Sequence, residues 1–425
     1  MSQLRLQLPS LVRRDNCTEL CAALGGGREL KISIDAPAIV LDRLIPSIIP
    51  FLPISLLVAG QERRSLHIDA GVDDAWWLNL MGGFWPLMRR LFDLDEMPVT
   101  RKGSALLAPP LTNEIALMFS AGVDSFYSLK KMRDLGVRPD WFVNINAGAH
   151  DHYRDCWAQR IANVREVARE VGVGLITIDT NFHEIFSAPH IRSHSVRNLA
   201  AVYTLFPGIA RFVYSSTPAF EDISYESAKK YDIGYLEHAV CSTLTPAQIS
   251  LQLLGWDADR IAKTVAVAED RLANRSLDVC VDGEYQSRRT ATEPINCGRC
   301  SKCIRTMLTL DHYGLLERFR SQFPTQQYLD RREELIAALT RSTYPLDVAV
   351  RRLIRPSTFG KDTDSGAYTP TFRRVAAPVR AIGRAARWFA HGLTASLTLR
   401  PGSRPRRVAQ RVKAMLMPTR SSRMG

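Results

Sequence analysis

The residues with the clearest chemical potential run from Phe119 to Ser125 and read Phe-Ser-Ala-Gly-Val-Asp-Ser. They follow a short apolar stretch, residues 115–118, and precede a segment that favours helix from about Ser125. A strand, a small-residue loop and a helix N-terminus together present backbone N–H groups and partial positive charge to an anion. The pattern predicts a loop that binds pyrophosphate.

Each residue type in this loop suits that task. Small side chains at Ser120, Ala121 and Gly122 let the backbone approach a phosphate closely, and the hydroxyls of Ser120 and Ser125 add donors. Asp124 would be unfavourable beside a bare anion, but it suits a site where Mg²⁺ bridges it to phosphate. The alternative is an ordinary helix that is capped by Ser120 or Asp124.

A second chemical signal is a cluster of three cysteines at positions i, i+3 and i+6, where thiolates can converge on one metal ion. These are Cys297, Cys300 and Cys303. A structural zinc site needs four ligands, and we predict Cys280 as the fourth, with Cys241 and His312 as fallbacks. A [4Fe–4S] cluster also uses grouped cysteines, so the spacing leaves the metal open. Three incidental free cysteines are the remaining alternative.

The loop resembles the Ser-Gly-Gly-X-Asp-Ser loop of the N-type ATP pyrophosphatase superfamily, with Ala121 in place of the first glycine. Members of that superfamily split ATP into AMP and pyrophosphate, usually to adenylate a carboxylate, carbonyl or amide oxygen. A methyl group at position 121 would clash if the backbone there needs a positive φ. The resemblance implies that Asp124 and Ser125 are catalytic and that ATP is held by Phe119, Ser120, Ala121, Gly122, Val123, Asp124 and Ser125.

The loop and the cysteine cluster together resemble the 7-cyano-7-deazaguanine synthases, over roughly residues 112–315. Those enzymes use ATP to convert 7-carboxy-7-deazaguanine and ammonia into an amide and then a nitrile. Arg197-Asn198 matches an Arg-Asn pair in that family's substrate region, which implies a catalytic role for Arg197; an ordinary helix start is the alternative. Cys280 lies further from Cys297 than the family's first cysteine usually does. The resemblance implies ATP, Mg²⁺ and Zn²⁺ as cofactors.

Strand-like and helix-like segments alternate along the middle of the chain. We expect strands over 114–119, 141–146, 175–179 and 211–215, with helices over 125–135, 155–171 and 193–206. This alternation predicts an α/β fold with a doubly wound parallel sheet, Rossmann-like and similar to the adenine nucleotide alpha hydrolases. Ligands then bind at the carboxyl ends of the strands. We expect mostly helix over 223–275.

The composition along the chain suggests three parts. Residues 1–110 form an α+β accessory domain, 111–345 the ATP pyrophosphatase domain with a zinc-stapled segment at 280–303, and 346–425 a basic, partly disordered tail. Residues 351–425 hold 17 Lys and Arg residues and two Asp, so the whole net charge of +13 arises in the tail. A basic tail is compatible with RNA or an anionic membrane surface as a partner, or with simple solvation.

Other polar residues leave alternatives open. Asn144 to Ala149 and Ser215 to Thr217 follow predicted strands and could contact adenosine or substrate, or only satisfy loop backbone. Arg260 and Lys263 could meet triphosphate, but a solvated basic face is favoured. The cluster His150-Asp151-His152 is better explained as a helix start than as a metal site.

These signals predict a cytoplasmic enzyme, because clustered metal-ligand cysteines indicate a reducing compartment and no secretory signal is visible. The expected reaction is ATP-dependent ligation of an acid to a nitrogen nucleophile. The acid is a small acidic molecule, with a deazapurine as one candidate, or a protein end. A tRNA-modifying thiolase or ligase and a non-catalytic, zinc-stabilised nucleotide-binding module are the alternatives. A homodimer is compatible with the sequence.

Overall fold

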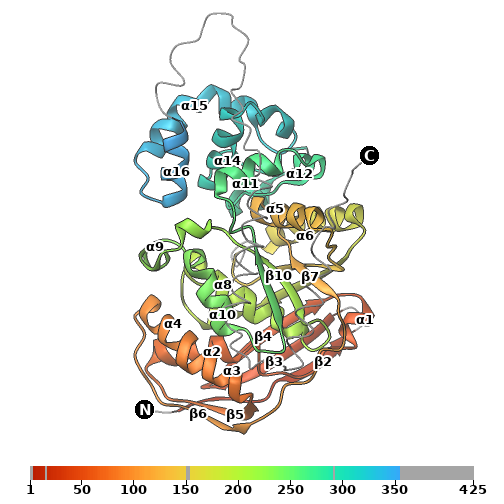
Figure 1. Cartoon of the computed structure of the whole chain (residues 1–425), viewed down its shortest axis with the longest axis vertical. Helices are drawn as coiled ribbons and strands as arrows, with labels where there is room; N and C mark the ends of the chain where they lie inside the picture. The colour runs from red at the N-terminus through yellow and green to blue at the C-terminus, as the bar shows by residue number, and fades with distance from the viewer. Residues whose placement is uncertain (1–2, 15–16, 150–153, 291, 355–425) are drawn as a thin grey trace, which may run out of the picture. The chain divides into compact units, whose positions relative to one another are not determined.

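A mixed sheet of eight strands carries the parallel strands that the sequence predicts (Figure 1). The computed structural model describes residues 3–14, 17–149, 154–290 and 292–354, all within one packing unit. The sheet order is β11-β10-β7-β8-β9-β4-β3-β2. Five strands are parallel: β7 (Ile115–Met118), β8 (Trp141–Asn146), β9 (Gly174–Thr180), β10 (Arg211–Ser215) and β11 (Ser250–Leu254).

The N-terminal region extends this same sheet. Strands β2 (Ser10–Arg14), β3 (Cys17–Gly25) and β4 (Arg28–Asp35) form an antiparallel meander. The last of them pairs antiparallel with β9, from Ile32 opposite Thr180 to Asp35 opposite Thr177. The expected parallel arrangement therefore holds for five strands, and the complete sheet is mixed because β4 meets β9 in the opposite direction.

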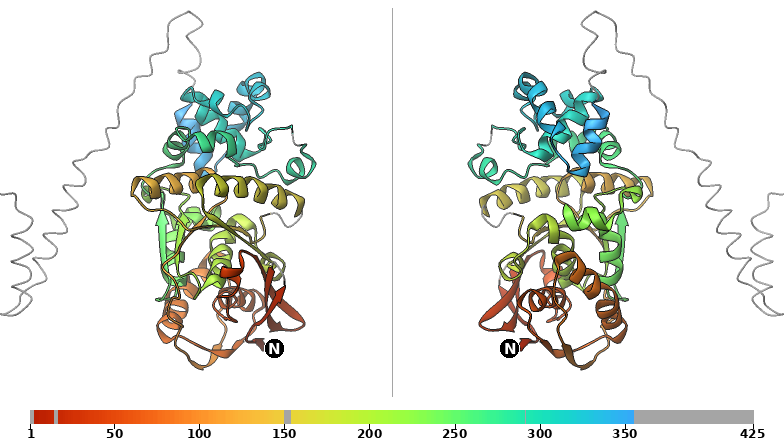
Figure 2. Two further views of the ribbon diagram at one scale, coloured as in Figure 1. Left: turned by 90° about the vertical axis from the view of Figure 1, so that its right-hand side faces the viewer. Right: turned by 90° about the vertical axis from the view of Figure 1, so that its left-hand side faces the viewer.

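Helices cover both faces of the parallel strands. Side chains alternate between the two faces of a strand. Leu117 and Phe142 pack in one core with α5 (Val123–Asp134) and α6 (Arg154–Val171), whereas Met118 and Val143 pack in a second core with α8 (His190–Val202) and α10 (Glu237–Leu244). Two turned views show α6 running across one side of the sheet (Figure 2).

The strand order creates a switch point between β7 and β10. From β7 the chain moves outward to β8 and β9, and it then returns to the other side of β7 to form β10 and β11. Connections leave the carboxyl ends of β7 and β10 in opposite directions, which is where ligands bind in open α/β sheets. The loop at 119–122 and the segment at 216–219 both begin at this point.

A second, three-stranded parallel sheet and several helices complete the N-terminal region. Its strands are β1 (Leu4–Leu6), β5 (Leu66–Val72) and β6 (Val99–Ser104). Helix α3 (Asp74–Asn79) packs on α10, where Trp76 Nε1 donates to the Leu244 carbonyl at 2.8 Å. The remaining helices here are α1 (Ala38–Leu41), α2 (Leu52–Glu62), a π-helical turn η1 (Leu80–Phe84) and α4 (Trp85–Phe92).

The C-terminal half is mainly helical. Helices α14 (Ser301–His312), α15 (Thr325–Thr340) and α16 (Pro345–Leu353) pack on the same core as α5 and α6. Among the described residues, no helix combines the length and apolarity that a bilayer crossing requires. The shorter elements are α7 (Phe182–Ile185), η2 (Tyr203–Leu205), η3 (Phe220–Asp222), α9 (Tyr225–Lys230), η4 (Ile233–Leu236), α11 (Arg260–Val267), α12 (Arg271–Ser276), α13 (Gly283–Arg288) and η5 (Leu316–Phe319).

Candidate functional site

The predicted phosphate loop connects β7 to α5 at the switch point. Phe119 anchors it, because its N–H donates to the Val143 carbonyl at 2.9 Å and its ring stacks on Phe142 with centroids 4.2 Å apart. Gly122 is the N-cap of α5 and no side chain caps the helix. Within the described ranges, no group accepts a hydrogen bond from the backbone N–H of residues 120–125. These N–H groups form an unfilled set of donors beside the positive end of a helix dipole.

Ala121 adopts a backbone conformation that favours glycine. Its φ is +58°, in the left-handed region, and its side chain is fully buried. A non-glycine residue there stores about 1 kcal/mol of strain. The N–H of Asp278 donates to the Ala121 carbonyl at 2.9 Å, so a distant segment holds this strained turn in place.

Asp124 lies in the first turn of α5 and is already neutralised. Arg260 Nη2 lies 2.7 Å from Asp124 Oδ2, and Lys263 Nζ lies 3.6 Å from Asp124 Oδ1. Both cations come from α11, one turn apart. The sequence interpretation that favoured a solvated basic face is wrong for them, because the Lys263 side chain is 0% exposed and that of Arg260 is 18% exposed.

Lys263 connects the loops that follow β7 and β10. Besides its contact with Asp124, its ammonium donates to the carbonyls of Ser216 at 2.7 Å and Thr217 at 3.0 Å, just after β10. Burial lowers the pKa of Lys263, and the charge of Asp124 opposes this effect. One side chain therefore fixes the loop after β10 relative to the phosphate loop after β7.

Glu237 is a buried carboxyl at this point that sequence reasoning missed. The Thr217 N–H donates to Glu237 Oε2 at 3.1 Å, while Oε1 has no hydrogen-bond partner among the described residues. Burial raises the pKa of Glu237 well above its usual value. Gly234 leaves room for this group, since a Cβ there would lie 3.3 Å from Oε1. No motif or periodicity marks Glu237 in the sequence.

Arg197 lies near the end of β8, but its guanidinium already donates hydrogen bonds to backbone carbonyl oxygens. Its Nη2 donates to Phe186 at 2.7 Å and to Ala188 at 3.0 Å, and the residue is 1% exposed. A Cβ on Gly148 would come within 3.0 Å of Arg197 Nη1, which locates the guanidinium beside the loop after β8. These contacts give Arg197 a structural task, and its catalytic role stays a prediction.

The remaining polar candidates have mainly structural contacts. Ser125 Oγ donates back to the Gly122 carbonyl at 3.0 Å and closes the first helical turn. Asn144 Nδ2 donates to the Phe119 carbonyl at 3.0 Å, and Asn144 Oδ1 accepts from Trp157 Nε1 at 3.0 Å. Asn144 therefore supports the start of the phosphate loop. The cluster at 150–152 lies outside the described residues.

The four predicted cysteines converge. The Sγ atoms of Cys280, Cys297, Cys300 and Cys303 all lie within 4.8 Å of one another. Cys303 Sγ is 3.9 Å from that of Cys297 and 3.4 Å from that of Cys300. A tetrahedron of thiolates at about 2.3 Å from zinc has edges of about 3.8 Å, so the spacing fits such an ion. This donor set suits Zn²⁺ and also iron–sulfur chemistry.

Backbone and charge support these thiols as metal ligands. Cys297 Sγ accepts from the N–H groups of Arg299 at 3.4 Å and Cys300 at 3.3 Å. Hydrogen bonds from the other three thiols lower the pKa of Cys300, whereas hydrogen bonds with Cys297 and Cys300 raise the pKa of Cys280 and burial raises that of Cys303. Cys280 is thus the fourth member of the cluster, as predicted. The fallback Cys241 lies in the other core, on the opposite face of the sheet.

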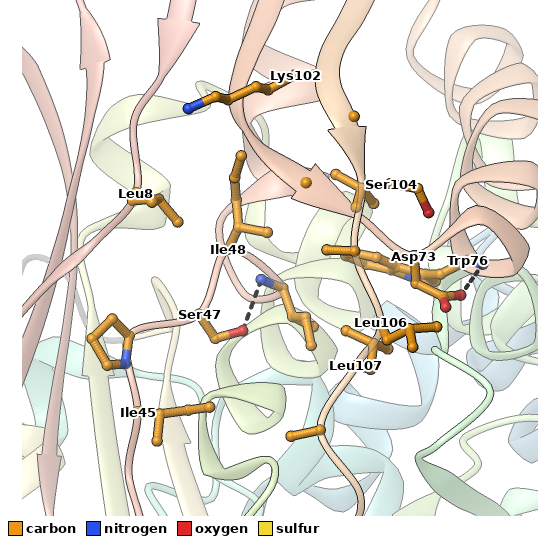
Figure 3. A pocket seen from close by; sticks show the side chains of 18 of the residues that line it. Leu8, Ile45, Ser47, Ile48, Asp73, Trp76, Lys102, Ser104, Leu106 and Leu107 are labelled. Carbon is orange, nitrogen blue, oxygen red and sulfur yellow. Dashed lines mark hydrogen bonds between the residues drawn. The ribbon is translucent and has the colours of Figure 1, made fainter.

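One cavity lies away from the phosphate loop. A cavity of about 600 Å³ is lined by Leu8, Ile48, Trp76, Lys102 and Leu107 among others (Figure 3). It adjoins the segment that leads into β7, at the amino ends of the parallel strands. It therefore lies on the opposite edge of the sheet from the phosphate loop, and we assign it no part in the chemistry of that loop.

A scan against protein-family models and searches of curated proteins and of solved structures found no match to this chain. The comparisons therefore show no family, and the site has to be interpreted from its own geometry.

Proposed function

We propose that this protein is an ATP-dependent ligase that adenylates a carboxylate-type substrate and transfers it to a nitrogen nucleophile, as the 7-cyano-7-deazaguanine synthases do. The observation that carries the proposal is the set of unfilled N–H donors at residues 120–125, at the switch point of the sheet. Polyphosphate is the ligand class that such a turn binds best. The Rossmann-like strand order supports the same conclusion.

The charges around the loop support a triphosphate rather than a single phosphate. Arg260 and Lys263 flank Asp124. Lys302 on α14 also interacts electrostatically with Asp124 and Arg260. Three cations beside six amides can balance the charge of the β- and γ-phosphates. When phosphate oxygens engage Arg260, the Asp124 carboxylate becomes available to hold Mg²⁺, which would neutralise the leaving pyrophosphate.

The proposed chemistry needs no protein nucleophile. A substrate carboxylate oxygen attacks the α-phosphorus, the bond from that phosphorus to the bridging oxygen breaks, and pyrophosphate leaves. The nitrogen nucleophile then attacks the acyl carbon, AMP departs with the oxygen, and the nitrogen loses a proton. The phosphate loop and Arg260 orient the triphosphate for in-line attack, and Lys263 holds the two loops in place. The Cys cluster is structural in this scheme, because four ligands leave a zinc ion no open position.

Acid-dependent release of AMP and pyrophosphate from ATP tests the proposal. Candidate acids are supplied with ammonium, 7-carboxy-7-deazaguanine first, and products are quantified by chromatography. We expect turnover by the wild-type chain and its loss in Asp124→Ala, with metal content and circular dichroism unchanged. Undiminished AMP release from Asp124→Ala would exclude the proposed role of the loop, and ADP as the product would exclude the reaction type.

A further inference from the structure

One short segment connects the phosphate loop with the Cys cluster. Residues 277–280 follow α12 and end at the metal-ligand candidate Cys280. Two residues earlier, the Asp278 N–H supports the left-handed Ala121 through its 2.9 Å hydrogen bond. Asp278 itself is buried and its carboxylate lies 3.2 Å from Arg160 Nη2. The position of this segment therefore decides the shape of the phosphate loop.

Asn296 holds the same segment from the other side. Its side chain is fully buried. Asn296 Oδ1 accepts from the N–H groups of Val279 at 2.8 Å and Cys280 at 3.1 Å. Its Nδ2 donates to the carbonyls of Leu277 at 2.8 Å and Gln322 at 3.0 Å. One amide thus satisfies four backbone groups, three of which belong to 277–280.

Because of its place in the chain, Asn296 connects the Cys cluster to residues 277–280. It directly precedes Cys297, so the backbone that presents a metal ligand also presents this amide. Its own N–H donates to the Gln322 carbonyl at 3.1 Å, which fixes the backbone at residue 296. A shift of residues 296–297 would therefore be transmitted to Ala121 through two hydrogen bonds. One joins Asn296 to residues 277–280, and the other joins Asp278 to Ala121.

We propose that Asn296 is a positioning residue for the phosphate loop: through residues 277–280 it couples the geometry of the Cys cluster to the binding of the β- and γ-phosphates of ATP. The coupling acts on the loop's shape, not on the metal. Without the Asn296 side chain, residues 277–280 are held only at Asp278 and Cys280. The backbone groups that Asn296 had bonded are then left buried without hydrogen bonds. The turn at Ala121 then relaxes towards ordinary backbone conformations, and the N–H groups of residues 120–125 lose the arrangement that this turn gives them.

The test compares Asn296→Ala with a matched amide elsewhere. Asn181 also bridges two backbone groups, accepting from the Lys31 N–H at 2.8 Å and donating to the Glu29 carbonyl at 2.9 Å, between β4 and β9. Both variants are prepared with full zinc loading. Inorganic pyrophosphate binding is measured by calorimetry. Amide hydrogen exchange is followed at Asp278 and Phe126, whose N–H groups donate to the carbonyls of Ala121 and Gly122 in the phosphate loop. We expect Asn296→Ala to bind pyrophosphate about tenfold more weakly, with faster exchange at Asp278 and Phe126 than in Asn181→Ala.

A conservative variant separates positioning from general stability. Asn296→Asp keeps the two acceptor contacts to residues 279 and 280, and its buried carboxyl keeps one of the two donations only when it is protonated. It should therefore retain more affinity than Asn296→Ala at acidic pH. Equal affinities and equal exchange in Asn296→Ala and Asn181→Ala would overturn the inference. The measurement of pyrophosphate affinity rests on the proposed function, while the measurement of hydrogen exchange does not. A wild-type chain that fails to bind pyrophosphate would thus count against the function alone, and the exchange contrast would still decide the role of Asn296.

Discussion

Arg260 Nη2 lies 2.7 Å from Asp124 Oδ2, so the acidic residue of the phosphate loop is paired before any ligand arrives. The two side chains come from helices α5 and α11, which pack against each other beside the switch point. Because both are only partly exposed, solvent screens the pair less than it would screen a surface ion pair. A phosphate that enters the loop must compete with Asp124 for the guanidinium.

Arg260→Ala should therefore weaken pyrophosphate binding by about tenfold to a hundredfold, the range expected for a lost charge-assisted hydrogen bond. The loss has two sources: one phosphate contact disappears and the charge of Asp124 is left less compensated near the anion. Calorimetry with inorganic pyrophosphate measures it. Arg133→Ala is the control, because Arg133 is also an Arg that pairs with an Asp, Asp270 at 2.8 Å, at the other end of α5. Equal losses in both variants would contradict a phosphate contact by Arg260.

Ala121→Gly should keep pyrophosphate binding and change the free energy of unfolding by less than about 1 kcal/mol. Glycine relieves the strain of φ +58°, but it also raises the entropy of the unfolded chain, and the two effects nearly cancel. Ala121→Val should destabilise by about 2 kcal/mol or more, because a β-branched residue is poorly tolerated in that conformation and the site is fully buried. Chemical denaturation gives both values. Similar stabilities for the glycine and valine variants would show that the turn is free to change its conformation.

Parts of the fold are readable from sequence because burial dictates their pattern. The predicted bounds of β8 and β10 agree with the observed strands, since each has a core of aromatic and β-branched residues, Trp-Phe-Val in β8 and Phe-Val-Tyr in β10, which favours a strand. Strand β11 was missed: it reads Ser-Leu-Gln-Leu-Leu at the edge of the sheet, within a region of helical composition. Pairing with β10 decides its state, and such pairing has no local signature.

Long-range contacts explain the other differences. The apolar run at 44–60 contains three prolines, yet α2 forms in it, because Pro53 lies in the first helical turn, where its missing N–H costs nothing. The pairing of β4 with β9 joins segments about 140 residues apart, so no local pattern reveals it. In the site, the spacing of the cysteines identified a cluster, whereas the burial of Lys263 and Glu237 depends on tertiary partners alone.

Cys303→Ser should abolish stoichiometric metal binding and lower the unfolding temperature. The segment around residues 280–303 is held by the cluster and has few apolar contacts of its own, so loss of one ligand removes much of the metal's contribution to folding. Elemental analysis of purified protein should give one zinc per wild-type chain and far less for the variant. Cys21→Ser is the control, since Cys21 lies half-buried on β3 outside the cluster. Several iron atoms with inorganic sulfide in the wild-type protein would instead identify an iron–sulfur centre.

Glu237→Gln should stabilise the protein at alkaline pH and have little effect at acidic pH. The pKa of Glu237 is raised by burial, so between its unfolded value of about 4.3 and its folded value the native state keeps a proton that the unfolded state releases. Wild-type stability then falls as pH rises through that window, by up to about 1.4 kcal/mol per pH unit. Glutamine has no proton to lose and can still accept from the Thr217 N–H. The measurement is the free energy of unfolding of both proteins from pH 5 to pH 8.5, with Glu317→Gln as a solvent-exposed control. A stability difference that stays constant across this range would show that Glu237 is ionised in the native state.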